Sequence, residues 1–252
     1  MKAIVIAAGP GKRLGNLTLD RPKCLLEVGG KTIIENQLEI FRHHNIKDIA
    51  IVRGHMKKMI NFPDVKYYEN TNYLNNNILQ SLFCAKQGIN DDFLFTYSDI
   101  LYDNDVVGKL LSEECEIGLI VDTGWKKRYE GRTLHPPEEA ELVFVENGFV
   151  TKIAKGLDPE KAHGEFIGLA KFSGKSVEIL KTVFNEVNSN FQNKQFHTAA
   201  TIEKAYLTDM LQELINRGYE VKNIDIDGGW HEIDTPQDLE RARQEWKPVE
   251  VS

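Results

Sequence analysis

Apolar positions along the chain group in two ways, as short continuous runs and as helical stripes. Short runs rich in β-branched residues, each followed by a glycine or polar turn, lie at 3–8 and 49–52, and this pattern is typical of buried strands. Between them, residues 32–44 space their apolar side chains along one helical face, and Thr32 with Glu35 matches a capping box. A strand, a helix and a strand in this order predict a βαβ unit with a parallel sheet.

The rest of the chain continues this alternation. We expect further strands at 65–69, 93–97, 117–121, 164–172 and 221–226. We expect further helices at 78–87, 105–114, 177–187, 202–217 and 237–246. Two alternating runs joined by Asn147-Gly148 predict a β-hairpin over 140–155.

Residues 124–139 are charged and contain proline, which predicts a loop or lid. Together with the hairpin, this lid forms a small insertion over about 124–160. The pattern therefore predicts a single α/β domain over 1–252. We expect it to be Rossmann-like, with a mixed, mostly parallel sheet, helices on both faces and the inserted hairpin and lid.

The composition argues against several classes of protein. The chain has 252 residues and a formal net charge of −7, with 31 Lys and Arg against 38 Asp and Glu. A net acidic chain argues against a nucleic-acid partner, and no apolar run has the length of a membrane span or the form of an export signal. Three cysteines without a Cys-x-x-Cys pair argue against a zinc site and a disulfide framework. We therefore expect a cytoplasmic protein without nucleic-acid or membrane partners.

The loop after the first apolar run carries the strongest chemical pattern. It holds Gly9 and Gly11, with Lys12 and Arg13 directly after them. Glycines let backbone N–H groups approach an anion closely, and the two cations suit phosphate oxygens. The loop lacks the Gly-Lys-Ser/Thr ending of a P-loop, and Leu14 stands where a dinucleotide-binding loop has its third glycine. The pattern therefore predicts a phosphate-binding loop of another kind.

Residues 7–14 and 21–26 together carry a family signature. They read A-A-G-x-G-x-R-L and R-P-K-x-L-L, and the second motif adds Lys23 as a further cation. The pair resembles the signature of sugar-phosphate and alcohol-phosphate nucleotidyltransferases, most of all the CTP-dependent phosphonate and phosphocholine cytidylyltransferases. The resemblance extends from residue 2 to about residue 243. It implies Mg²⁺-dependent transfer of a nucleotidyl group with release of pyrophosphate, in which the protein positions the reactants and stabilises charge.

The resemblance assigns the charged residues to parts of this reaction. Arg13, assisted by Lys12, would bind the leaving pyrophosphate, and Lys23 would stabilise the α-phosphate in the transition state. Asp99 follows an apolar strand and matches the family's strand-end metal aspartate, while Asp234 matches the distal one. A carboxylate at the carboxyl end of a central strand is well placed for Mg²⁺. The alternative for both aspartates is a capping or turn role.

Two further groups of residues are expected to bind the substrates. By resemblance, the nucleotide contacts the glycine loop and an asparagine-rich segment, at Ala7, Ala8, Gly9, Gly11, Lys12, Asn76, Asn77 and Ser81. The acceptor contacts charged and aromatic residues spread along the chain, namely Asp122, Trp125, Lys126, Arg128, Arg132, Lys155, Glu165, His197 and Trp230. Turn and cap chemistry is the alternative for the asparagines, and a structural role is the alternative for each acceptor residue.

These expectations combine into one reaction with open alternatives. We expect CMP transfer from CTP to a small phosphonate such as 2-aminoethylphosphonate, because segments 97–101, 122–125 and 164–170 look more like those of phosphonate-pathway enzymes. Phosphocholine as the acceptor, and a hexose-1-phosphate with UTP or dTTP, stay open. A nucleotide-binding regulatory protein without turnover is the alternative from a different class. The sequence also leaves the oligomeric state open, with a homodimer as one alternative.

Overall fold

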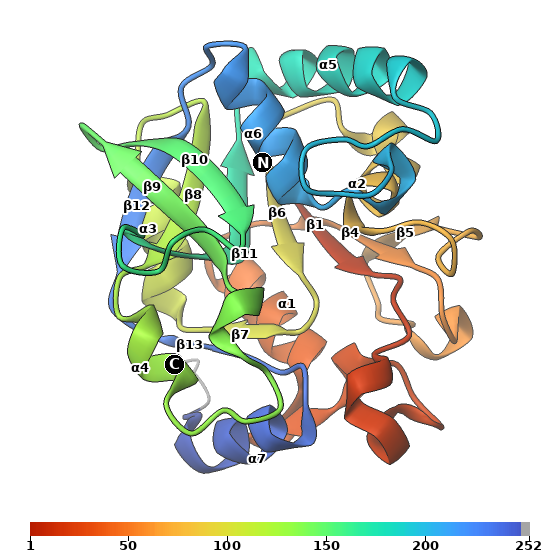
Figure 1. The fold of residues 1–252 in the computed structure, drawn as a ribbon. Coiled ribbons are helices and arrows are strands. Elements are labelled where there is room, and N and C mark those ends of the chain that lie inside the picture. The colour runs from red at the N-terminus through yellow and green to blue at the C-terminus, as the bar shows by residue number, and fades with distance from the viewer. Residues whose placement is uncertain (248–252) are drawn as a thin grey trace.

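A nine-stranded sheet forms the centre of the computed structural model, which describes residues 1–247. The strand order is β5-β4-β1-β6-β11-β8-β12-β10-β9 (Figure 1). The bounds are β1 Lys2–Ala7, β4 Asp48–Arg53, β5 Val65–Glu69, β6 Phe93–Tyr97, β8 Ile117–Asp122, β9 Glu141–Glu146, β10 Phe149–Lys155, β11 Gly164–Phe172 and β12 Lys222–Ile226. Two short ribbons lie outside this sheet, β2 (Glu27–Val28) with β3 (Lys31–Thr32) and β7 (Ile100–Tyr102) with β13 (Trp230–Glu232).

The sheet is mixed, and most of its strands point the same way. β5, β4, β1 and β6 pair in parallel, and so do β8 and β12. β11 runs antiparallel between β6 and β8, and β10 runs antiparallel to β9 and β12. The hairpin expected around Asn147-Gly148 is the β9–β10 pair. The predicted α/β fold with a mixed, mostly parallel sheet is therefore confirmed.

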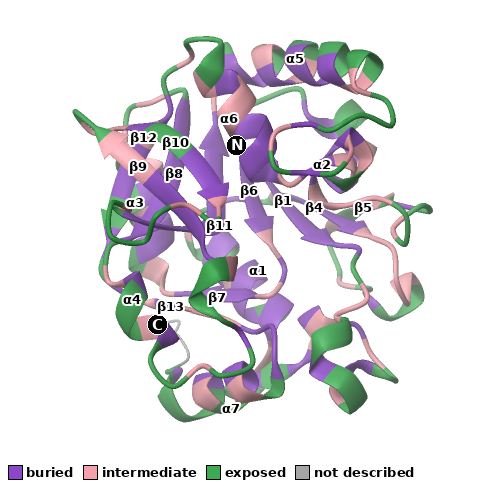
Figure 2. Ribbon diagram, viewed as in Figure 1, coloured by how far each residue is buried: buried purple, intermediate pink, exposed green. Residues whose placement is uncertain are grey.

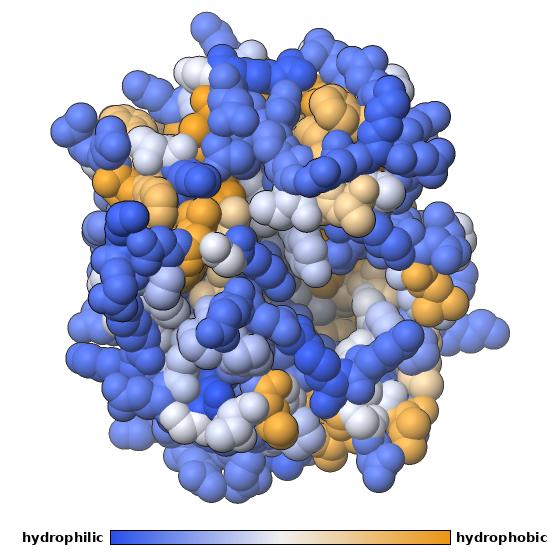
Figure 3. Space-filling view, in the orientation of Figure 1, coloured by the Kyte–Doolittle hydropathy of each residue, from blue (hydrophilic) through white to orange (hydrophobic). Residues whose placement is uncertain are grey.

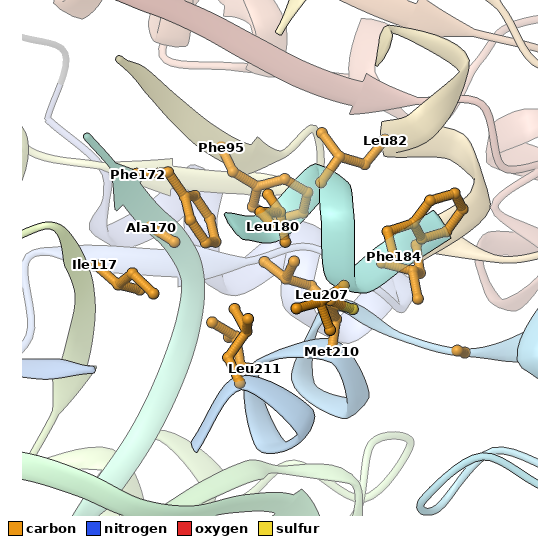
Figure 4. Packing of buried hydrophobic residues seen from close by; sticks show 14 of the residues in the cluster. Leu82, Phe95, Ile117, Ala170, Phe172, Leu180, Phe184, Leu207, Met210 and Leu211 are labelled. Carbon is orange, nitrogen blue, oxygen red and sulfur yellow. The ribbon is translucent and has the colours of Figure 1, made fainter. Parts of the chain in front are cut away.

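Helices cover both faces of the sheet because its strands present apolar side chains on both. In β1, Ala3 and Val5 pack in one hydrophobic cluster, and Ile4 and Ile6 pack in the other. The first cluster is closed by α1 (Ile33–His43) and α3 (Asn104–Ser112), the second by α2 (Ile78–Cys84), α5 (Ser176–Asn190) and α6 (Leu207–Asn216). Buried residues accordingly run along the central strands (Figure 2). In the second cluster, Leu180 of α5 and Leu207 and Met210 of α6 pack with Phe95 of β6 and Phe172 of β11 (Figure 4).

Several helix boundaries differ from the sequence-based expectation. The helix expected over 202–217 is wrong in its first turn, since residues 202–204 form a separate 3₁₀ turn and α6 begins at Leu207. The carboxylate of Asp209 accepts hydrogen bonds from the backbone N–H of Tyr206 (2.8 Å) and of Thr198 (2.9 Å), which caps the helix there. Residues 124–139 are also less irregular than expected, because they contain the short helix α4 (Trp125–Tyr129).

The last helix, α7 (Pro236–Glu245), follows its sequence signals closely. Thr235 caps it, and the side chain of Asp238 completes the capping box by accepting from the Thr235 backbone N–H at 2.8 Å. Proline occupies the first helical position, as expected. Among residues 1–247, no helix is both long and apolar enough to cross a lipid bilayer.

A glycine in β11 allows the strand to pass close to Tyr97. Gly168 has a φ of +85°, and a Cβ at this position would lie 2.2 Å from the Tyr97 ring. We expect Gly168→Ala to lower the free energy of unfolding by about 3 kcal/mol, because it adds backbone strain and a steric clash. Denaturant unfolding at a fixed pH measures this change.

Gly218→Ala is the matched control for this prediction. Gly218 has a similar φ of +86°, but a Cβ there would meet no atom within 4 Å. It should therefore lose only the strain contribution, about 1 kcal/mol. Equal losses in the two variants would show that the close approach to Tyr97 is unimportant.

Candidate active site

Two adjoining cavities open where the chain leaves the carboxyl ends of β1 and β6. The first, the nucleotide cavity, has a volume of about 350 Å³. Of the predicted nucleotide, phosphate and metal residues, all but Ala8 line it, namely Ala7, Gly9, Gly11, Lys12, Arg13, Lys23, Asn76, Asn77, Ser81, Asp99 and Asp234. The face seen in Figure 3 is hollowed near its middle. Residues from four distant parts of the sequence therefore meet around one space.

The second cavity, called here the acceptor cavity, has a volume of about 460 Å³. Its lining includes three of the predicted acceptor residues, Lys155, Glu165 and Trp230. The two cavities share five lining residues: Arg13, Asn77, Ile78, Asp99 and Asp234. Molecules bound in the two cavities would therefore meet beside the two aspartates.

The shared wall carries a network of ion pairs. Lys23 Nζ lies 2.7 Å from Asp99 Oδ2 and also donates a hydrogen bond to Asp234. Arg13 pairs with Asp234 on one side and with Glu139, at 2.7 Å, on the other. Backbone pairing holds the two aspartates near each other, since β7 and β13 form a ribbon and the Ile233 N–H donates to the Asp99 carbonyl at 2.9 Å.

The network keeps its members charged despite their burial. Burial acts to lower the pKa of Lys23, but the carboxylates of Asp99 and Asp234 outweigh it and raise that pKa. Burial acts to raise the pKa of Asp234, but Lys23 and Arg13 outweigh it and hold that pKa below its usual range. Two cations and two carboxylates therefore form one charged network beside the two cavities, in which Lys23 and Asp234 are largely buried and Arg13 is partly exposed.

The donor set of this wall fits a magnesium ion. Within residues 1–247, Asp99 Oδ1 is buried and has no hydrogen-bond partner. Asp234, whose pKa is lowered, supplies a second ionised carboxylate at the same lysine. Mg²⁺ prefers oxygen ligands and is usually held by one or two carboxylates together with substrate phosphates.

A second candidate metal site, formed by His135, Glu232 and Asp234, fits a metal ion less well than the pair of Asp99 and Asp234. His135, Glu232 and Asp234 each offer one atom within 4.8 Å of the others. However, Arg132 Nη2 lies 3.0 Å from His135 Nδ1. Because arginine can only donate, this contact occupies the Nδ1 lone pair that a metal ion would need. Burial, with Arg132 next, lowers the pKa of His135 to about 4. The ring is therefore neutral at physiological pH and serves as a partner of Arg132.

The polar residues of the nucleotide cavity are organised by Asn70, which sequence reasoning left outside the site. Asn70 is buried, and its Nδ2 donates to Asn76 Oδ1 at 2.7 Å and to Ser81 Oγ at 2.8 Å. Asn77 instead caps α2, because its Oδ1 accepts from the Ile78 N–H at 2.9 Å. The capping alternative thus describes Asn77, while Asn76 and Ser81 are oriented side by side.

The acceptor cavity contains the predicted Glu165 and two further glutamates, Glu141 and Glu232, that the sequence did not single out. Glu141 Oε2 accepts from the Tyr97 hydroxyl at 3.0 Å, and Glu165 Oε1 accepts from the Tyr129 hydroxyl at 2.6 Å. Burial raises the pKa of Glu141 and that of Glu165 to about 7 in each case. Glu232 lines the same cavity. Only its end-of-strand position in β13 could have indicated it beforehand.

The other predicted acceptor residues do not line either of these two cavities, and most have partners elsewhere. Asp122 accepts from the Trp230 indole N–H at 2.7 Å, and Arg132 donates to Asp238 at 2.8 Å. Lys126 pairs with Glu160 on the surface, and Arg128 lies 3.4 Å from Asp122. His197 pairs with Glu213, and Trp125 packs against Tyr129. Ala8, the predicted nucleotide residue that lies outside the nucleotide cavity, accepts a backbone hydrogen bond from the His55 N–H.

Comparison with known proteins identifies the family. The MobA-like NTP transferase domain matches residues 3–137, more than half of the chain. The chain belongs to this family. It is a nucleotidyltransferase, as the glycine loop and Lys23 motif implied, and its predicted kinship with the CTP-dependent enzymes is confirmed.

Three relatives extend this result over the whole chain. The CTP:phosphoglutamine cytidylyltransferase of Campylobacter jejuni is 33% identical in an alignment 254 residues long that covers 95% of this chain and 98% of that protein. The solved CTP:phosphocholine cytidylyltransferase of Streptococcus pneumoniae (LicC) has a TM-score of 0.73 and 22% identity, covering 96% of this chain and 97% of that one. The inositol-1-phosphate CTP transferase of T. maritima has a TM-score of 0.72 and 23% identity, covering 97% and 96%. At such identities the two structures support the fold alone.

Proposed function

We propose that this nucleotidyltransferase transfers CMP from CTP to a small phosphorylated acceptor related to phosphoglutamine, with release of pyrophosphate. The observation that carries the proposal is the pair of cavities that share Arg13, Asp99 and Asp234. A transfer between two phosphate-bearing molecules needs two adjoining sites with strong charge stabilisation between them. The nucleotide and the acceptor are inferred from the full-length similarity to CTP:phosphoglutamine cytidylyltransferase.

The residues of the shared wall account for the chemistry of this transfer. An oxygen of the acceptor's phosphoryl group attacks the α-phosphorus of CTP, a new P–O bond forms, and the bond to the bridging oxygen breaks so that pyrophosphate leaves. Lys23 offers N–H donors to the α-phosphate, while Lys12 and Arg13 neutralise the departing pyrophosphate. A Mg²⁺ ion held by Asp99 and Asp234 would add charge neutralisation when bound. No covalent protein intermediate is needed.

The polar pair of Asn76 and Ser81 suits the recognition of a pyrimidine. An amide and a hydroxyl can donate to a ring carbonyl and accept from an exocyclic amine. Their orientation by the buried Asn70 limits the rotamers they adopt, which favours selective hydrogen bonding. The pair is therefore compatible with the carbonyl and the exocyclic amine of cytosine in CTP.

The phosphonate acceptor expected from the sequence is narrower than the similarity supports. The Campylobacter jejuni relative, which is similar over nearly its full length, is named for phosphoglutamine. The two solved structures are named for phosphocholine and inositol-1-phosphate. We therefore propose a phosphate-bearing acceptor and keep 2-aminoethylphosphonate as a competing candidate. The cytoplasmic location and the homodimer alternative stay predictions.

Pyrophosphate release tests the proposed function. CTP, UTP, dTTP, ATP and GTP are each assayed with Mg²⁺ against phosphoglutamine, 2-aminoethylphosphonate, phosphocholine and glucose-1-phosphate. We expect CTP with phosphoglutamine to give the highest kcat/KM. Highest activity with glucose-1-phosphate and UTP or dTTP would overturn the proposal, and so would the absence of pyrophosphate release with every pair.

A further inference from the structure

The acceptor cavity holds a carboxylate oxygen that has no hydrogen-bond partner among residues 1–247. Glu165, in β11, is only 4% exposed and lines this cavity. Its Oε1 accepts from the Tyr129 hydroxyl at 2.6 Å. Its Oε2 is buried and, in the described part of the chain, has no hydrogen-bond partner. A buried acceptor left unsatisfied costs about 1–3 kcal/mol and more when charged, so this oxygen points to a donor that the described residues do not supply.

The surroundings of Glu165 favour a cationic donor. The lining of the acceptor cavity carries six carboxyl groups and two cations, and this excess of carboxylates favours positive charge there. The six are Asp99, Glu139, Glu141, Glu165, Glu232 and Asp234. Arg132 pairs instead with Glu232, at 3.1 Å, and with Asp238, at 2.8 Å, and donates no hydrogen bond to Glu165 Oε2. A primary ammonium fits this set because it presents three N–H donors on a small group.

The same cavity also holds an unpaired cation. Lys155 ends β10 and lines the cavity, with its Nζ 4.7 Å from the centre of the Tyr206 ring. Among residues 1–247, no carboxylate lies within the 4.0 Å of an ion pair with Lys155. Lys155 and Glu165 therefore face one cavity without neutralising each other. A ligand that carries both an anionic and a cationic group would satisfy both.

We propose that the acceptor carries a primary ammonium group bound by Glu165, so that Glu165 determines acceptor specificity while Lys155 binds an anionic group of the same molecule. The inference rests on the proposed function and refines it to zwitterionic, amino-acid-like or aminoalkyl acceptors. Phosphorylated alcohols and sugars without an amine are excluded as good substrates. An apolar side chain at position 165 would fill the same space in β11, but it could not distinguish an acceptor with an amine from one without.

Acceptor pairs that differ only in the amine test this inference on the unaltered protein. 2-Aminoethylphosphonate is compared with ethylphosphonate, and phosphoglutamine with the same compound lacking its α-amine, by pyrophosphate release and by calorimetric binding. We expect the amine to raise kcat/KM or affinity at least about 10-fold, because its loss leaves a buried carboxylate unpaired. Equal values for the two members of both pairs would overturn the inference.

The variant Glu165→Gln locates the selectivity in one side chain. We expect it to lose at least about 10-fold in kcat/KM for aminated acceptors, while the value for the deaminated partner changes less than about 3-fold and KM for CTP stays unchanged. Glu160→Gln is the control, since Glu160 is exposed and lies outside both cavities. Equal losses on both acceptors in Glu165→Gln would assign Glu165 a structural role and overturn the inference.

The failure of the proposed function gives a different result. If no acceptor gives pyrophosphate release, the proposed transfer reaction is wrong. Calorimetry with the aminated and deaminated compounds then still measures whether Glu165 binds an ammonium group. Release that is indifferent to the amine leaves the transfer reaction standing and removes the role of Glu165. The wild-type comparison also decides the matter if the variant does not fold.

Discussion

Lys23→Ala is expected to lower kcat for pyrophosphate release about 10²–10³-fold, with a much smaller change in KM for CTP. This range is the typical cost of removing one donor that stabilises developing charge in a water-poor site. Lys23 is 12% exposed at its side chain, lines the nucleotide cavity and pairs with Asp99 and Asp234, which line both cavities. Its ammonium group therefore lies beside the two aspartates where the two substrates would meet.

The measurement needs a control for folding, because the substitution leaves two carboxylates without their cation. Activity is therefore compared at equal concentrations of folded protein, determined by circular dichroism and thermal unfolding. Lys31→Ala is the matched variant, since Lys31 also pairs with a carboxylate, Glu39, but lines neither cavity. It should keep kcat within about 2-fold of the wild type. A Lys23→Ala enzyme with kcat within about 3-fold of the wild type would contradict the assigned role.

Asp122→Ala is expected to lower the free energy of unfolding by about 3–5 kcal/mol, which corresponds to a fall in Tm of about 6–20 °C for a chain of this size. Asp122 is fully buried. It accepts from the Trp230 indole N–H at 2.7 Å and from the backbone N–H of Gly124 at 2.9 Å and Gly228 at 3.1 Å. Its loss would leave these donors buried and unsatisfied.

This prediction also separates a structural role from a binding role for Asp122. Because Trp230 lines the acceptor cavity, we expect KM for the acceptor to rise as Trp230 loses its anchor, while KM for CTP stays close to that of the wild type. Asp227→Ala is the control, because Asp227 is exposed and lies in the same turn region. It should change stability by no more than about 0.5 kcal/mol. A loss below 1 kcal/mol in Asp122→Ala would show that these hydrogen bonds contribute little.

Contiguous motifs allowed part of the site to be predicted from sequence. Gly9, Gly11, Lys12 and Arg13 lie in one short loop, and their conformation depends mainly on their own φ and ψ preferences. The capping box at Thr32 could be predicted for the same reason, because its hydrogen bonds join residues three apart. The hydrophobic runs likewise predicted the strands and the two-faced sheet, since burial on both faces requires them.

The distribution of acceptor residues could not be predicted in this way. Glu141, Tyr206 and Glu232 line the acceptor cavity although nothing in their local sequence distinguishes them from surface residues. Conversely, Arg132 and His197 looked equally suited to a substrate but pair with Asp238 and Glu213. Whether a charged side chain meets a ligand or a protein partner depends on which residues other elements bring beside it, and that information is absent from local patterns.

The sequence by itself determined the α/β class, the phosphate-binding loop and the identity of the cations, because each depends on residues that are neighbours in the chain. Only the tertiary structure decided how these parts form a site. Lys23 meets Asp99 across 76 positions and Asp234 across 211. The pairing of β7 with β13 brings the two aspartates together, and the position of β11 places Glu165 in the lining of the acceptor cavity. Such contacts arise from packing between distant elements, which minimises the exposed apolar surface of the whole chain.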